Sequence, residues 1–185
     1  MNIVEIIQKN LGFEPLKKID PNTQETTGIE TSMGNSALAQ AGIPSILLGI
    51  YNKLEQEPEM SWLDTDQSKT DLMETIFGKT RKTVVLQIHQ YAKLQDKHSD
   101  QQLEHIASEA MRVVKENIKD EKSENSIRSF VAKYKPETLL YLPAALQMGI
   151  ILQNNNLDDR TAKMEGPLSS LMHSVEKTFN SSQNN

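Results

Sequence analysis

The chain has 185 residues, which is enough for one ordinary domain or for two small helical lobes that share an interface. It contains no cysteine, so disulfides, thiolate metal sites and cysteine nucleophiles are excluded. The formal net charge is −5 and aromatic residues make up 5% of the chain. Nucleic acid is therefore not expected as a partner, because it binds clustered Lys and Arg and stacks on aromatic rings.

The first third of the chain is expected to be helical, because its apolar residues recur at spacings of three and four. The pattern predicts a helix over residues 3–11, a short helix over 13–19 and a long helix from about 35 to 56. Residues 20–35 are polar and contain few large apolar side chains, which predicts a mobile loop.

Two apolar segments contain an internal proline: residues 37–51 contain Pro44, and residues 138–152 contain Pro143. Proline removes one backbone hydrogen bond and clashes with the preceding turn, so both segments are expected to be buried helices that are bent or broken there. The alternative is that both are buried helices that need small residues for close packing. The similarity between the two segments is too short to establish an internal repeat.

The middle of the chain shows a possible boundary between two lobes near residues 57–66. Beyond it, the clearest amphipathic pattern predicts a helix over residues 99–118. Pro136 suits the first turn of the second proline-containing helix. Further helices are expected over residues 65–77, 84–94 and 127–134.

The end of the chain combines a polar loop, a last helix and a disordered tail over residues 181–185. Gly166-Pro167 opens the expected last helix, whose apolar side is formed by Leu168, Leu171, Met172, Val175 and Phe179. Together the patterns predict an all-α fold of about eight helices, forming one bundle-like domain over residues 1–180 or two lobes. No apolar stretch is long enough for a membrane span, so a cytoplasmic protein is expected.

The loop before the last helix holds the densest group of charges, and it is our first choice for a site that binds a ligand or a partner. Arg160 can act there as a fork-shaped donor to an ionic group. The alternative is that the two aspartates cap a turn while Arg160 pairs with a carboxylate. The candidate binding residues are Asp158, Asp159, Arg160, Lys163 and Glu165.

The N-terminal helix followed by Leu11-Gly12, and the small and aliphatic residues 37–49 around Pro44, resemble a bacterial family of unknown function typified by YidB. The resemblance covers mainly residues 1–55. It implies an all-helical fold and no known chemistry.

The patterns support three functions, which we place in order. The first is a non-catalytic protein-interaction or scaffolding module, whose partner is another protein or, through an apolar helix face, a second copy of the chain. Amphipathic helices are abundant, and no credible catalytic set is present. The second is a binding module for an apolar small molecule, housed between the proline-containing helices. Its candidate pocket residues are Ile46, Leu47, Leu146, Met148 and Ile150.

The third function is a metal-assisted hydrolase that uses His105 and Glu109 with more distant carboxylates. The two residues have the i, i+4 spacing of a ligand pair on a helix, but the same spacing suits an ordinary surface contact. No cofactor is expected.

Overall fold

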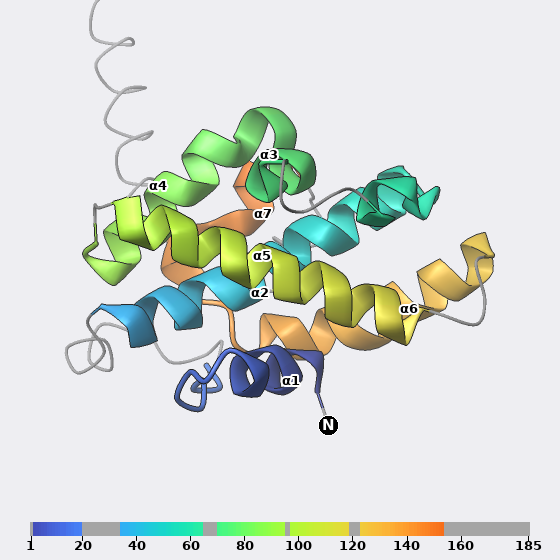
Figure 1. Ribbon diagram of the computed structural model, residues 1–185. Helices are drawn as coiled ribbons and strands as arrows, with labels where there is room; N and C mark the ends of the chain where they lie inside the picture. Colours follow the sequence, from blue (N-terminus) through green and yellow to red (C-terminus); the bar gives the residue numbers. More distant parts are fainter. Residues whose placement is uncertain (1, 20–33, 65–69, 95–96, 119–122, 154–185) are drawn as a thin grey trace, which may run out of the picture.

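The computed structural model describes residues 2–19, 34–64, 70–94, 97–118 and 123–153 (Figure 1). Most of the predicted mobile loop, the predicted last helix and the tail lie outside the described residues. Over the described residues the fold is all-α, as predicted. The α-helices are α1 (Ile3–Asn10), α2 (Asn35–Gln56), α3 (Leu72–Phe77), α4 (Arg81–Ala92), α5 (Lys97–Asn117), α6 (Glu124–Leu139) and α7 (Met148–Ile151).

Three short 3-10 helices complete the described part: η2 (Met60–Asp64), η3 (Gly78–Thr80) and η4 (Ala144–Leu146). Because α7 is a single turn of four residues, six longer α-helices are described, and the predicted count of about eight is not met. Part of the difference lies in residues 13–19, which form no helix.

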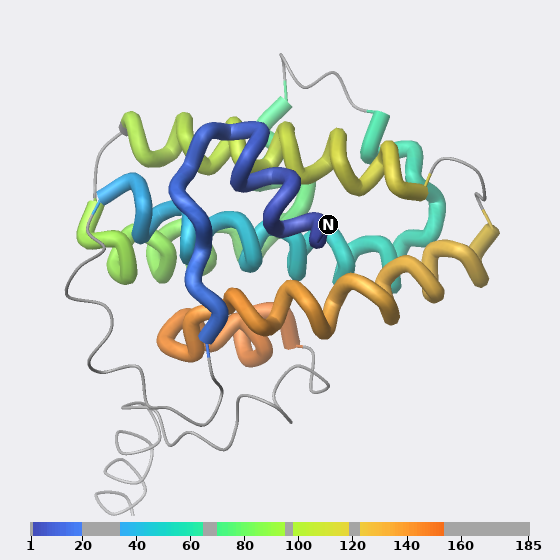
Figure 2. The backbone as a smooth tube through the Cα atoms, turned by 90° about the horizontal axis from the view of Figure 1, so that it is seen from below, coloured from blue at the N-terminus to red at the C-terminus, as the bar shows by residue number. Residues whose placement is uncertain are grey.

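Helix α2 is the centre of the fold, and its residues 37–51 are all buried. It contacts α1, α3, α4, α5 and α6, and the two views of the backbone show these helices arranged around it (Figures 1 and 2). A helix that is apolar on every side must be covered on every side, because each exposed apolar surface would cost free energy. The first proline segment therefore forms the core.

The chain passes through Pro44 without a break in α2, so of the two expectations, a bend or a break, the break is wrong for this segment. The alternative of close packing agrees with the structure at two glycines. A Cβ atom on Gly42 would lie 3.1 Å from Cδ2 of Leu103 on α5, and one on Gly49 would lie 2.4 Å from Cε1 of Phe77 on α3. The small residues let α5 and α3 approach the backbone of α2 closely.

The second proline segment is not one helix. Helix α6 includes Pro136 in its interior and ends at Leu139, so Pro136 does not begin a new helix as predicted. Pro143 disfavours helical backbone at the residue before it, and Gln147 then takes a left-handed conformation with φ of 49°. The chain consequently folds into a turn, η4 and α7.

The amphipathic pattern of α5 is confirmed, since every residue of its predicted apolar stripe is buried. The stripe consists of Leu103, Ile106, Ala107, Ala110, Val113, Val114 and Ile118. One hydrophobic core includes residues from both sides of the possible boundary near residues 57–66, and also Leu63 of η2, which lies within it. None of the described helices combines the length and the apolar character that crossing a membrane requires.

Candidate functional site

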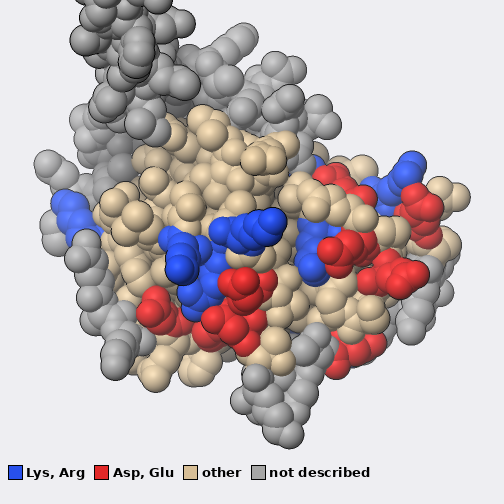
Figure 3. All heavy atoms as spheres, turned by 90° about the horizontal axis from the view of Figure 1, so that it is seen from above, with Lys and Arg blue, Asp and Glu red and all other residues tan. Residues whose placement is uncertain are grey.

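The described surface has a face without formal charges. Residues 83–92 and 138–153 contain no Asp, Glu, Lys or Arg, although these residues make up 24% of the chain. The two stretches meet in the fold, because α4 contacts both η4 and α7. Figure 3 looks onto the side that carries α3 and α4 and shows a broad uncharged area beside a band of acidic and basic side chains. We call the surface of these two stretches the uncharged face.

Large apolar side chains are exposed on the uncharged face. Leu86 on α4 is 50% exposed, Leu140 after α6 is 41% exposed, and Ile150 on α7 is 61% exposed. These three are the exposed large hydrophobic residues of the described part of the chain, and all of them lie within the two uncharged stretches. Large apolar side chains that stay exposed on a surface without charge favour a protein-interaction site.

Helix geometry explains why these side chains point outward. On α4, Val84, Ile88 and Ala92 are buried at spacings of four residues and face α2. Leu86 lies two residues after Val84, which turns it by about 200° to the opposite side of the helix. Ile150 is likewise exposed on α7, whose Met148 and Gly149 are buried.

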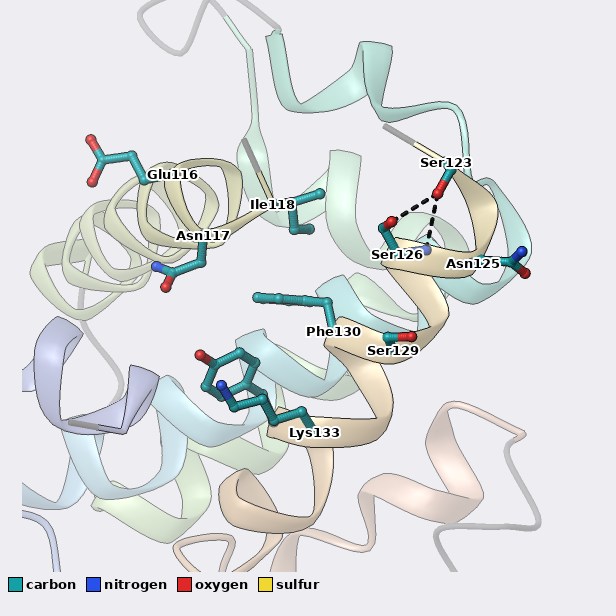
Figure 4. Close-up of a pocket in the computed structure, with 10 residues that line it drawn as sticks. Glu116, Asn117, Ile118, Ser123, Asn125, Ser126, Ser129, Phe130 and Lys133 are labelled. Carbon is teal, nitrogen blue, oxygen red and sulfur yellow. Dashed lines mark hydrogen bonds between the residues drawn. The ribbon is translucent and has the colours of Figure 1, made fainter. Parts of the chain in front are cut away.

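A groove lies between the end of α5 and the first half of α6, with a volume of about 540 Å³ (Figure 4). Ile118 and Phe130 form its buried floor, and the Nζ of Lys133 lies 4.7 Å from the ring centroid of Tyr134. The remaining lining residues are Glu116, Asn117, Ser123, Asn125, Ser126 and Ser129.

The serine hydroxyls of this groove take part in a helix cap. The backbone N–H of Ser126 donates to Oγ of Ser123 at 3.3 Å, and the two hydroxyl oxygens lie 2.7 Å apart. These bonds close the first turn of α6, as a side chain at the N-cap commonly does. The arrangement is therefore explained by the helix and requires no ligand.

A second hollow of about 380 Å³ lies between α1 and the segment that contains Pro15 and Leu16. Within its lining, the hydroxyl of Tyr141 donates to Oε1 of Glu5 at 3.0 Å. This hydrogen bond, with one from the backbone of Asn2, lowers the pKa of Glu5. Burial and the same carboxylate raise the pKa of Tyr141 to about 12. The pair joins α1 to the turn after α6.

A serine and a histidine that the sequence did not bring together meet between α4 and α5. Oγ of Ser99 lies 3.1 Å from Nε2 of His89, and Oδ1 of Asp100 lies 3.4 Å from the same nitrogen. A catalytic triad needs the carboxylate on the other ring nitrogen and a serine that substrate can reach. Ser99 is 1% exposed, so the contact joins two helices and does not form a nucleophile.

The junction of α3, α4 and α5 contains a further charged group. Arg81 pairs with Asp71 at 2.9 Å, while Glu104 accepts the backbone N–H of Leu72 at 2.9 Å and that of Met73 at 3.4 Å. Burial raises the pKa of Glu104, and the nearby carboxylate of Asp71 adds to the effect. The carboxylates hold the first turn of α3 and the neighbouring Arg81, which is a structural task.

The predicted site residues fall into two groups, one outside the described residues and one within them. The charged loop with Asp158, Asp159, Arg160, Lys163 and Glu165 lies outside the described residues. Of the candidate pocket residues, Ile46, Leu47, Leu146 and Met148 are buried in the hydrophobic core, while Ile150 is exposed on the uncharged face. Neither of the two hollows described above is lined by any of these five.

The candidate metal ligands lie on α5, where His105 is exposed. Glu109 accepts hydrogen bonds from Arg112 at 2.6 and 2.8 Å and from Asn10 at 2.7 Å. The guanidinium of Arg112 lowers the pKa of Glu109. Within the described ranges, no group of three or more His, Cys, Asp or Glu is placed to hold a metal ion.

The uncharged face was not among the predicted sites, although the sequence contains a signal for it. Residues 83–92 and 138–153 are stretches of ten and sixteen residues without a charge, in a chain that is one quarter charged. Most of the first was predicted to be a helix, and most of the second was predicted to be a buried helix. Which of their apolar side chains remain exposed depends on the packing.

Comparison with known proteins adds no relative, since no family model, curated protein or solved structure matches this chain. The resemblance of residues 1–55 to the YidB family stays a prediction.

Proposed function

We propose that this chain is a non-catalytic protein-interaction or scaffolding module that self-associates through its uncharged face. The observation that carries the proposal is the exposure of Leu86, Leu140 and Ile150 on two adjoining stretches without charge. Covering these side chains removes apolar surface from water, which contributes about 25 cal/mol for each Å².

The absence of formal charge on the face suits a second copy of the chain as the occupant. Each copy carries a formal net charge of −5, so two copies repel one another over most relative orientations. The repulsion is weakest where uncharged faces meet, and two identical apolar faces need no matching pattern of opposite charges. Symmetric dimers of this kind, in which the same patch meets itself, are the commonest soluble oligomers.

The other two functions receive less support. An apolar ligand would need space beside Ile46 and Leu47, and both are buried in the hydrophobic core. A metal-assisted hydrolase would need a free Glu109, and this carboxylate is engaged by Arg112. The cytoplasmic location and bacterial origin are further parts of the proposal, and they rest on the sequence.

Sedimentation equilibrium of the full chain over about 10 μM to 1 mM, the range in which a weak dimer dissociates, tests the proposal. We expect a dimer that Leu86→Lys weakens by about tenfold or more. Fully burying a leucine contributes about 1.5–3 kcal/mol, about half of which remains for Leu86, and a symmetric dimer contains two copies. Leu86 is half exposed, so the variant should keep its fold, which circular dichroism verifies.

The matched control is Gln101→Lys, which adds the same charge at an exposed position on α5. It should leave the dissociation constant of the dimer within about twofold of the wild-type value, since the substitution lies outside the uncharged face. Equal effects of both lysines would refute association through this face.

A further inference from the structure

The uncharged face adjoins a part of the chain that is suited to cover it. The face ends at Gln153, and 32 further residues follow it in the sequence. Within them the pattern predicts an amphipathic helix over residues 167–179, with Leu168, Leu171, Met172, Val175 and Phe179 on one side.

We propose that residues 167–179 dock on the uncharged face of their own chain and compete there with the second copy. This inference rests on the proposed function, because it assigns a regulator to the same face. Isolated helices shorter than about 12–15 residues are marginal in water, so the predicted helix needs an apolar surface against which to form. The exposed side chains of Leu86 and Ile150 offer one.

The lengths of the two partners match. A helix of thirteen residues is about 20 Å long, and α4, with its 12 residues, is about 18 Å long at 1.5 Å per residue. The connection over residues 154–166 can span up to about 43 Å when extended. The segment can therefore reach any part of the face, in either direction along α4.

The chemistry of the two surfaces matches as well. The apolar side of the predicted helix contains no charged residue, and the uncharged face contains none either. The opposite side of the helix carries Ser170, Ser174 and Lys177, which would remain in water. Docking within one chain also avoids the repulsion between two copies of charge −5.

The first test measures dimerisation of the full chain with Leu171→Lys/Val175→Lys, two substitutions on the apolar side of the predicted helix. We expect tighter dimerisation than in wild type. Only an uncovered face can bind a second copy. If the segment covers the face nine-tenths of the time, uncovering it raises the affinity of the dimer about tenfold for each copy. The matched control, Ser170→Lys/Ser174→Lys, adds the same charges on the polar side and should not tighten the dimer.

The second test locates the segment directly. Since the chain has no cysteine, Ser174→Cys accepts a single nitroxide label. In a dilute sample, we expect the label to broaden the amide resonances of α4, including that of Leu86, and to leave that of Lys133 on α6 sharp. Chains that carry the nitroxide but no ¹⁵N, mixed with ¹⁵N-enriched chains without the nitroxide, should show no broadening.

The outcomes separate the two proposals. Broadening of α4 in the mixed sample would overturn docking within one chain, and so would equal broadening of α4 and α6. If the apolar-side variant dimerises no more tightly than wild type while Leu86→Lys still weakens the dimer, this inference fails and the proposed function stands. If Leu86→Lys leaves dimer affinity unchanged both in wild type and in Leu171→Lys/Val175→Lys, the proposed function fails.

Discussion

Gly49 provides a test of how tightly the core around α2 is packed. A Cβ atom at this position would lie 2.4 Å from Cε1 of Phe77 and 2.8 Å from Cγ2 of Ile76. Carbon atoms attract one another best at about 3.5–4.0 Å, so Gly49→Ala must displace Phe77 or the whole of α3. Both neighbours are 6% exposed, which leaves little room for a side-chain movement alone.

Two opposing effects set the magnitude of this change. Alanine is favoured over glycine inside a helix by about 1 kcal/mol, whereas overpacking a filled core costs about 1–3 kcal/mol. The contact at Gly49 is short and involves two buried side chains, so the cost should lie near the upper end. We expect Gly49→Ala to lower the free energy of unfolding by about 1–2 kcal/mol, and Tm by about 2–4 °C for each kcal/mol.

Urea unfolding followed by circular dichroism measures this free energy. The control is Gly42→Ala, whose Cβ would lie 3.1 Å from Cδ2 of Leu103 and 3.3 Å from Cδ1 of Ile106. These atoms are the ends of flexible side chains, so the gain in helix propensity should roughly cancel the cost. Phe77→Leu should be less destabilising in the Gly49→Ala background than in wild type. If Gly49→Ala is as stable as wild type, α3 does not pack against this glycine.

Two further predictions concern the turn after α6. Gln40→Leu removes side-chain hydrogen bonds to the backbone N–H and carbonyl of Lys17 and to the carbonyl of Tyr141. It should lower the free energy of unfolding by about 1–3 kcal/mol and speed hydrogen exchange of the Lys17 amide. Gln101→Leu, at an exposed position on α5, should do neither. Unchanged exchange of the Lys17 amide in Gln40→Leu would count against these bonds. Tyr141→Phe should raise the pKa of Glu5 toward its ordinary value, because the hydroxyl lowers it; carboxyl titration by NMR measures this shift. The associated loss of stability should be present above the ordinary pKa of Glu5 and fade as pH falls through the lowered one, so a pH-independent difference would refute the contact.

The sequence could predict the helical class and much of the core. The spacing of Leu103, Ile106 and Ala110 on α5 identifies the buried side of that helix, because a helix places residues three and four apart on one face. It could not predict the continuity of α2 at Pro44. Whether proline breaks a helix depends on the surrounding contacts, which supply packing energy that offsets one lost hydrogen bond.

Residues 13–19 illustrate the same dependence. Their apolar spacing predicted a helix, but the backbone of Lys17 instead pairs with the side chain of Gln40, and Ile19 donates its N–H to the carbonyl of Leu140 at 2.6 Å. Both partners are distant in the sequence. Local pattern cannot report hydrogen bonds of this kind, which compete with those of a helix.

The sequence by itself determined that this protein is helical, that it lacks thiol chemistry and that residues 83–92 and 138–153 carry no charge. Only the tertiary structure decided that these two stretches adjoin and that Leu86, Leu140 and Ile150 remain exposed on them. The physical reason is that helix periodicity fixes which side chains share a face, whereas burial depends on which other elements cover that face.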